Sequence, residues 1–390
     1  MIRPIGRSCS ADRSRNLRSP SMSSSCLTSI GTPRIAVIGA GVSGALCAQA
    51  LAQAGAQVEL FDKARGPGGR MATRRHGEGA QALHFDHGAT GFESHSLALQ
   101  PWIRRGAQAG WLAPWRAQRP DGADPVRWVA VPGMNEMVRQ LVGTLPLQLG
   151  QAVSALHAQP QHTTAPESAP RRWRLQLGEQ PLLPRSHDAV VLAMPPQQAA
   201  VLLQAHRPDW AEDARQVEME PCWTLMAETD EPPAWPASLL RPAHGPIALL
   251  LRDDHKPGRR LRPGRACWVV QARPEWSQAH RDERPEQIVA RLLDALRAEV
   301  NPGGDLPVHV AMAHRWLYSR PRPLLRAGPS CWWDAELGLG VCGDFLGGGT
   351  VELAALSGLD LAERIGREPP RPLLRERPAP ADLHRQEQPA

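Results

Sequence analysis

Three glycines and one acid near the start of the chain have the spacing of a dinucleotide-binding turn. The segment RIAVIGAGVSG places Gly39, Gly41 and Gly44 in a G-x-G-x-x-G pattern, and Asp62 ends the second apolar run after it. The first glycine permits a tight turn, the second lets a pyrophosphate approach the backbone, and the third lets a helix pack closely on a strand. An acid in the position of Asp62 accepts hydrogen bonds from a ribose.

The residues around this turn must form a strand, a helix and a second strand if the turn is to work. RIAVIG is a short β-branched run, ALCAQALAQAG has helical composition, and AQVELFD reads as the second strand. A membrane span is the alternative for so apolar a stretch. It is excluded by the three spaced glycines, by Gln49, Gln53 and Gln57, and by the acidic end of the second strand.

A second glycine pair indicates which dinucleotide is bound. GPGGRMATRR puts Gly68, Gly69 and Arg70 directly after the second strand. A dehydrogenase that binds NAD does not need such a loop. In a flavoprotein the loop crosses the pyrophosphate again, and an arginine, with its fixed fork of donors, pairs with phosphate or flavin. A glycine-rich surface loop with no ligand is the alternative interpretation.

The far end of the chain carries a matching element. LGVCGDFLGGGTVELAALSG reads as a strand, then Gly343 and Asp344, a glycine-rich turn, and a helix from about Thr350. Asp344 can accept hydrogen bonds from a ribityl chain, and the positive end of the helix can face the flavin. We therefore expect one FAD to be held by both chain ends. The expected cofactor-binding residues are Gly39, Ala40, Gly41, Val42, Ser43, Gly44, Asp62, Lys63, Gly69, Arg70, Met71, Gly343, Asp344, Thr350 and Val351.

With these elements the chain resembles the FAD-dependent amine oxidase superfamily, and within it the renalase-like bacterial oxidoreductases. The resemblance runs from about 34 to 365 and leaves 205–300 without a motif. It rests on VIGAGVSG, FDKARGPGGRMATRR, HFDHGA, VPGMNEMVRQL, VVLAMPPQQA, HRWLYSRP and CGDFLGGGTVELAALSGLDLA. GGRMATRR, PGMN and HRW point to the renalase-like branch.

The resemblance implies an α/β fold, with a Rossmann-type FAD domain like that of p-hydroxybenzoate hydroxylase and a second, mixed-sheet α+β substrate domain. The FAD domain is expected from 34–94, 131–204 and 305–366, and the substrate domain from 95–130 and 205–304. Residues 1–33 are expected to be a disordered leader and 367–390 a disordered tail. A transit peptide, or translation that begins at Met22, remains open for the leader.

Local patterns in the middle of the chain agree with a second domain. Residues 222–228, 246–254 and 266–274 read as strands, and 285–300 reads as an amphipathic helix with Ile288, Leu292, Leu293 and Leu296 on one face. Segments 151–159 and 171–178 read as a hairpin joined by a polar loop.

The family's usual amine-site groups are missing from the sequence. Neither lysine, Lys63 or Lys256, is placed as expected for a lysine that binds water at the flavin, and Tyr318 is the only tyrosine. No cysteine follows Gly343 in the turn where covalent-flavin members carry one, so we expect FAD to be non-covalent.

Renalase-like enzymes, by resemblance, oxidise isomeric dihydro-NAD(P) and pass the electrons to O2 to give H2O2. That reaction forms an aromatic ring and needs no strong base. His314, Arg315 and Trp316 are the candidate substrate-site residues, and Trp332 and Trp333 are further ring candidates. Core packing of the tryptophans and a surface ion pair of Arg315 are the alternatives. An FAD enzyme acting on an amine or another organic substrate, and a non-catalytic flavin-binding protein, remain open as functions.

The bulk composition excludes several other classes. The net charge is +6, but 1–34 hold six arginines and one acid, so the body is nearly neutral and a nucleic-acid partner is not expected. The seven cysteines include no C-x-x-C pair and read as reduced thiols of a cytoplasmic protein. His84 and His87 lie close together without a second ligand cluster, so we expect no metal site and interpret them as loop or core histidines.

Overall fold

The computed structural model describes residues 32–79, 82–159, 172–233, 235–322 and 328–370. All of them lie within one compact unit, 32–373. The leader lies outside the described residues apart from 32 and 33, and the tail is described only at its start. No helix in these ranges is long and apolar enough to cross a membrane.

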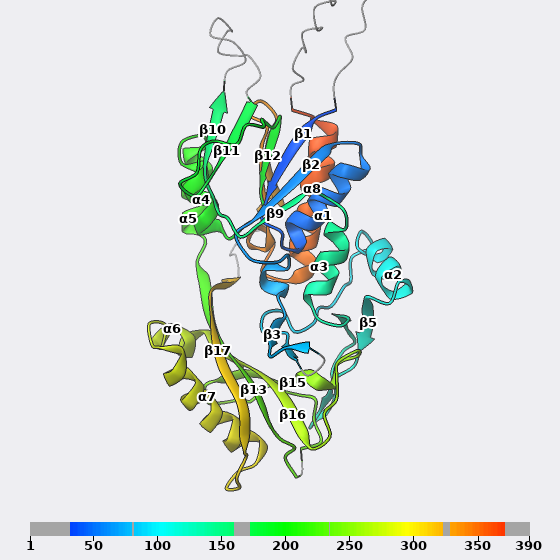
Figure 1. Ribbon diagram of the computed structural model, residues 1–390, viewed down its shortest axis with the longest axis vertical. Coiled ribbons are helices and arrows are strands. Elements are labelled where there is room, and N and C mark those ends of the chain that lie inside the picture. The colour runs from blue at the N-terminus through cyan, green and yellow to red at the C-terminus, as the bar shows by residue number, and fades with distance from the viewer. Residues whose placement is uncertain (1–31, 80–81, 160–171, 234, 323–327, 371–390) are drawn as a thin grey trace, which may run out of the picture. The chain divides into compact units, whose positions relative to one another are not determined.

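A six-stranded sheet carries the two chain ends that the sequence predicts to act together (Figure 1). Its strand order is β18-β19-β12-β1-β2-β9, and β18 alone runs antiparallel to its neighbour. The strands are β1 (Arg34–Ile38), β2 (Gln57–Asp62), β9 (Leu147–Leu149), β12 (Ala189–Leu192), β18 (Cys331–Asp334) and β19 (Leu339–Cys342).

Both faces of this sheet are covered, as parallel strands require. Ile35 and Val37 point to a core shared with helices α1, α3 and α8, whereas Ala36 and Ile38 point to a core shared with α4, α5 and the β10–β11 hairpin. The covering elements are α1 (Val42–Gln53), α3 (Asn135–Val142), α8 (Val351–Arg367), α4 (Pro196–Leu203), α5 (Pro208–Gln216), β10 (Val153–Gln159) and β11 (Arg172–Leu177). The predicted Rossmann-type strand–helix–strand unit and hairpin are thus confirmed.

A second sheet of five antiparallel strands has the order β14-β15-β16-β13-β17. Its members are β13 (Met219–Asp230), β14 (Leu239–Leu240), β15 (Ile247–Arg252), β16 (Arg265–Ala272) and β17 (Val308–Pro321). Helices α6 (Pro274–Ala279) and α7 (Pro285–Val300) cover one face (Figure 1), where Ile288, Leu292, Leu293 and Leu296 are buried as predicted.

The domain boundary expected at 305 needs a correction. Residues 308–321 do not belong to the six-stranded sheet; they form β17, which pairs with β13 along almost its whole length. The HRWLYSRP motif therefore lies on the second sheet. The reason is strand pairing: β17 runs antiparallel to β13, from Pro321 opposite Met219 to Val308 opposite Thr229, and so extends the second sheet.

Short elements connect the two sheets. Met226, Leu251 and Val269, on the face of the second sheet away from α7, join the same core as α1 and β1. The connecting elements are β3 (Arg74–His76), β4 (Leu83–Phe85), α2 (Gln100–Gln108), β5 (Leu112–Trp115), β6 (Gln118–Arg119), β7 (Gly122–Ala123), β8 (Arg127–Ala130), and the 3-10 helices η1 (Gly69–Met71), η3 (Asp253–His255) and η4 (Asp344–Leu346).

Candidate functional site

Two glycines of the first turn, Gly39 and Gly44, lie where no side chain would fit. Gly39 has φ +111°, and a Cβ there would lie 2.1 Å from the carbonyl oxygen of Ala193. A Cβ on Gly44 would lie 2.0 Å from the oxygen of Gly39, so α1 can begin this close to the sheet only with glycine. A Cβ on Gly41 would meet nothing within 4 Å, which leaves the turn open on the side where a pyrophosphate would approach.

The start of α1 has polar groups without partners. The N-cap residue, Gly41, provides no side-chain cap, and the buried hydroxyl of Ser43 has no hydrogen-bond partner among the described residues. Helix N-termini with free N–H groups bind phosphate. These residues therefore fit the pyrophosphate of a dinucleotide.

Asp62 lies at the end of β2 and faces the same turn. Its Oδ2 accepts from the Ala40 N–H at 2.7 Å, and its Oδ1 accepts from the Ala64 N–H at 2.8 Å. Each carboxylate oxygen has a second lone pair for a ribose hydroxyl. Lys63 is exposed and donates to Gln198, so its side chain points along the surface.

The second glycine loop meets the first. A Cβ on Gly69, which has φ +54°, would lie 3.3 Å from the Cα of Gly41. Arg70 then turns toward the far end of the chain and donates two hydrogen bonds to Asp344, at 2.7 and 2.5 Å. The structure thus brings together Gly41, Gly69, Arg70 and Asp344 from both chain ends. Met71 is buried in the core and offers no side chain to a ligand.

The C-terminal element forms the predicted turn and helix. The backbone carbonyl oxygen of Asp344 accepts hydrogen bonds from the N–H groups of Gly347, Gly348 and Gly349. The Gly343 N–H donates to the hydroxyl of Ser357. Thr350 caps α8 by accepting from Leu353 N–H, and Val351 is the first helical residue. The two glycine loops and the turn before α8 therefore lie together, with Arg70 as the link, whereas the side chains of Lys63 and Met71 point elsewhere.

A cluster of three rings lies beside Arg70. His87 is 5 % exposed, and its ring centroid is 4.9 Å from that of His314 and 4.9 Å from that of Trp316. The His314 and Trp316 centroids are 4.5 Å apart. We call His87, His314 and Trp316 the ring cluster.

Hydrogen bonds fix the loop that carries His87. Trp316 Nε1 donates to the His87 oxygen at 2.9 Å, and Gln271 Nε2 donates to the Gly88 oxygen at 2.6 Å. The Ala89 N–H donates to the Arg70 oxygen at 2.8 Å, and a Cβ on Gly88 would lie 2.0 Å from that oxygen. The ring cluster is therefore tied to the second glycine loop.

Both histidines of the ring cluster are held neutral. Burial, the neighbouring His314 and the charge of Arg74 lower the pKa of His87 to about 4. Burial and Arg74 also lower the pKa of His314. The Nδ1 of His87 is buried and has no partner among the described residues.

The other predicted ring and substrate residues lie elsewhere. Arg315 is on the opposite face of β17, because successive strand residues alternate, and it pairs with Asp282 at 3.6 Å. Trp332 packs near Trp210 and Phe345, and Trp333 donates to the oxygen of Glu368. Of the three candidates His314, Arg315 and Trp316, only the first and third join the ring cluster.

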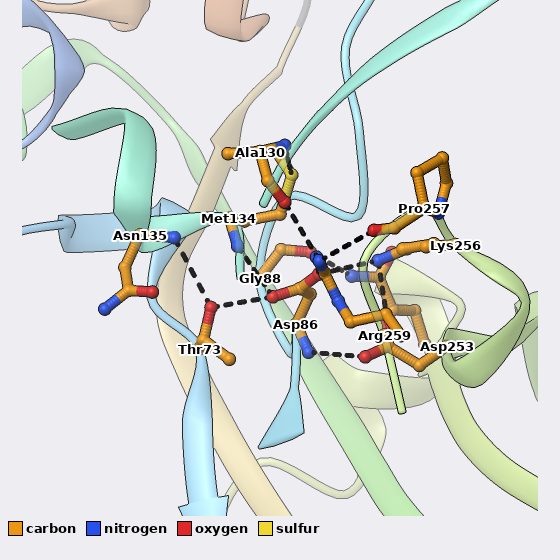
Figure 2. Close-up of polar contacts among 11 residues, drawn as sticks. Thr73, Asp86, Gly88, Ala130, Met134, Asn135, Asp253, Lys256, Pro257 and Arg259 are labelled. Atoms are coloured by element: carbon orange, nitrogen blue, oxygen red, sulfur yellow. Dashed lines mark hydrogen bonds and ion pairs between the residues drawn. The ribbon is translucent and has the colours of Figure 1, made fainter. Parts of the chain in front are cut away.

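A buried charge network surrounds Asp86, the residue before His87 (Figure 2). Lys256 Nζ donates to Asp86 at 2.9 Å and to Asp253 at 2.6 Å, and the three side chains are at most 1 % exposed. Arg259 also pairs with Asp86. Asp86 further accepts from Thr73 Oγ1 and from the Met134 N–H at the start of α3.

The network keeps Asp86 ionised and holds Lys256 in ion pairs with Asp86 and Asp253. Burial acts to raise the pKa of Asp86, but the charges of Lys256 and Arg259 outweigh it, and the pKa lies well below its usual value. We call Asp86, Asp253, Lys256 and Arg259 the charge network. Sequence reasoning missed it: only the acid inside the HFDHGA motif and the rarity of lysine could have pointed to it. No group of three or more potential metal ligands occurs in the described ranges.

Two family comparisons agree with this geometry. The model described as NAD(P)-binding Rossmann-like domain matches residues 37–105. The model described as Flavin containing amine oxidoreductase matches residues 102–366, more than half of the chain.

Solved structures share the fold at low identity. A protein titled as a protoporphyrinogen oxidase from an Exiguobacterium species has a TM-score of 0.67 and 13% identity, over 87% of this chain and 100% of that one. Cyclohexylamine oxidase from Brevibacterium oxydans has a TM-score of 0.62 and 13% identity, over 87% and 99%. Wild-type putrescine oxidase bound to putrescine has a TM-score of 0.59 and 13% identity, over 86% and 99%.

Proposed function

The chain belongs to the flavin containing amine oxidoreductase family, and we propose on this premise that it is an FAD-dependent oxidase acting on isomeric dihydro-NAD(P). Bound FAD supplies the hydride acceptor and the route for electrons to O2. Dihydro-NAD(P), O2 and one proton then give NAD(P)+ and H2O2. The FAD is proposed to be non-covalent, held between the two glycine loops and Asp344.

The observation that carries the proposal is the ring cluster, which offers aromatic surfaces but no strong base. His87, with a pKa of about 4, is a poor proton acceptor from an ammonium group. Lys256 is buried and paired with Asp86 and Asp253 inside the charge network, so it is not available to bind water at the cofactor. A donor that becomes aromatic on losing hydride needs position rather than a base.

The chain's own residues supply that position. Trp316 and Gln271 hold the backbone of the His87 loop, and that loop is bonded to the backbone of Arg70. A planar ring that stacks on the half-buried Trp316 would lie next to the Arg70–Asp344 link.

An amine oxidase is the second candidate, because the family match and two of the structural neighbours are named for amine oxidation. In that case an ammonium substrate would have to lose a proton before hydride leaves. An anaerobic screen of electron donors decides between the two. Flavin absorbance should disappear with isomeric dihydro-NAD(P) and persist with benzylamine and polyamines; the reverse order would favour the amine.

A further inference from the structure

A segment that follows the ring cluster runs from the second glycine loop to the first turn of α8. At its start, the Ala89 N–H donates to the backbone oxygen of Arg70 at 2.8 Å. In its middle, Phe92 and Trp128 exchange two backbone hydrogen bonds, at 3.0 and 2.7 Å. Beyond Phe92 the segment is bonded to α8. We call 89–96 the strap.

One carboxylate oxygen holds the far end of the strap. Glu352 is the second residue of α8, and its Oε1 accepts from the N–H groups of His95 and Ser96 at 2.7 and 2.8 Å. The same oxygen accepts from Ser94 Oγ at 3.2 Å. Burial acts to raise the pKa of Glu352, but the hydrogen bonds from Ser96, His95 and Ser94 outweigh it and the pKa is lowered. The three donors therefore bond to a charged carboxylate at neutral pH.

The strap completes a closed circuit of bonded elements beside the proposed cofactor site. Arg70 is bonded to the strap by its backbone and to Asp344 by its side chain. Asp344 begins the turn that ends at Thr350, the N-cap of α8. Glu352 then joins α8 back to the strap. The circuit borders the space between the glycine loops and Asp344, where FAD is proposed to bind.

We propose that Glu352 is a positioning residue that keeps the strap closed at the FAD site, and that FAD enters and leaves when the strap opens at 94–96. This inference rests on the proposed non-covalent FAD. Loss of the Glu352 contacts would free only one end of the strap, because Phe92 stays paired with Trp128. Opening one short segment requires less free energy than unfolding the protein. A closed segment slows entry and release by the same factor, so it changes both rates and leaves the affinity unchanged.

FAD release and rebinding test the inference, and neither measurement needs a substrate. The recovery of free FAD fluorescence after dilution of the loaded protein gives the release rate, and mixing apoprotein with FAD gives the binding rate. Glu352→Ala should raise both rates about 10-fold or more, the change expected when a charge-assisted hydrogen bond is lost, and should change the Kd less than about 3-fold. Peptides covering 93–99 should exchange their amide hydrogens faster, because His95 and Ser96 lose their acceptor.

Two further variants serve as comparisons. Glu352→Gln keeps an acceptor oxygen but loses the charge, and its rates should lie between those of the unaltered protein and Glu352→Ala. Glu363→Gln removes an exposed carboxylate that pairs with Arg367 on the same helix, and should leave both rates unchanged.

The inference is overturned if Glu352→Ala leaves the release rate unchanged. It is also overturned if release becomes faster while binding does not, because Glu352 would then stabilise the bound cofactor itself. Failure of isomeric dihydro-NAD(P) to reduce the flavin would contradict the proposed reaction alone, because FAD exchange is measured without it.

Discussion

Arg70 and Asp344 are 274 residues apart in the chain, and two hydrogen bonds join their side chains at 2.7 and 2.5 Å. Arg70 ends the second glycine loop, and Asp344 begins the turn before α8. The pair therefore fastens the N-terminal dinucleotide turn to the C-terminal element. Asp344 is 6 % exposed and Arg70 30 %, so the pair is shielded from much of the solvent.

Breaking this pair should lower the free energy of unfolding in a coupled way. We expect Arg70→Gln and Asp344→Asn each to cost about 1–3 kcal/mol, as for a charge-assisted hydrogen bond. In a double-mutant cycle the two losses should not add, because both remove one interaction. Arg367→Gln, which removes an exposed pair with Glu363, is the control and should cost less than about 1 kcal/mol. Additive losses in urea unfolding would show that the pair is not coupled.

Asp62 should be needed for FAD affinity. Changing Asp62 to Ala removes the proposed acceptor for the ribose, which should weaken FAD binding about 10- to 150-fold, or about 1.5–3 kcal/mol. It also frees the N–H groups of Ala40 and Ala64, so the melting temperature of the apoprotein is measured alongside. Asp62→Asn keeps one acceptor oxygen and should lose less FAD affinity than Asp62→Ala. Equal FAD affinity of all three proteins, measured by titration of the apoproteins, would show that Asp62 does not bind the ribose.

Removing one charge of the charge network should destabilise the protein more than removing two opposite charges together. Lys256→Met leaves Asp253 and Asp86 buried with too few positive partners, and should destabilise the protein by about 3–5 kcal/mol. Lys256→Met combined with Asp253→Leu removes one charge of each sign and should recover a large part of that loss. Melting temperatures of the two variants give the comparison. A double variant less stable than Lys256→Met would contradict this account of the network.

His87 should make the protein less stable in mild acid. Its pKa is about 4 in the folded protein and near 6.5 in an unfolded chain, so the unfolded state binds more protons between these values. The stability from neutral His87 is therefore complete above about pH 6.5 and is lost as the pH falls toward 4. At pH 5 the loss should be about 2 kcal/mol relative to neutral pH.

The comparison with His87→Phe isolates this contribution. His84, His255 and His314 also have lowered pKa values, so the whole protein loses stability in the same window. The variant should show a smaller difference between its unfolding free energies at pH 7.5 and pH 5.0. Parallel pH dependence in the two proteins would mean that His87 is not held neutral by the fold.

Local signals in the sequence were enough to find the dinucleotide turns. Gly39 and Gly44 are required by close backbone contacts within a short stretch, and such needs are visible in the spacing. The bond between Arg70 and Asp344 was not predicted as a contact, although both residues were assigned to one cofactor. Spacing shows which turn a residue belongs to, but not which distant turn it meets.

The ring cluster and the charge network depend on tertiary contacts that no local pattern contains. Asp86 and Lys256 are 170 residues apart, and each alone reads as an ordinary polar residue. His87 was interpreted as a loop or core histidine and is buried, but its packing on His314 and Trp316 follows from the position of β17. If 308–321 had been predicted as a strand, the alternation of side chains would have placed Arg315 on the face opposite to His314 and Trp316.

The central claim is that the protein takes a hydride from a dihydropyridine ring that becomes aromatic. The most direct measurement mixes the FAD-loaded protein anaerobically with 2- or 6-dihydro-NAD(P) in a stopped-flow instrument and follows the flavin absorbance. The account predicts bleaching within seconds, and on admission of air a return of the yellow colour with one H2O2 for each NAD(P)+ formed. Benzylamine, polyamines or ordinary 4-dihydro-NADH that reduce the flavin as fast as the isomers do would contradict it.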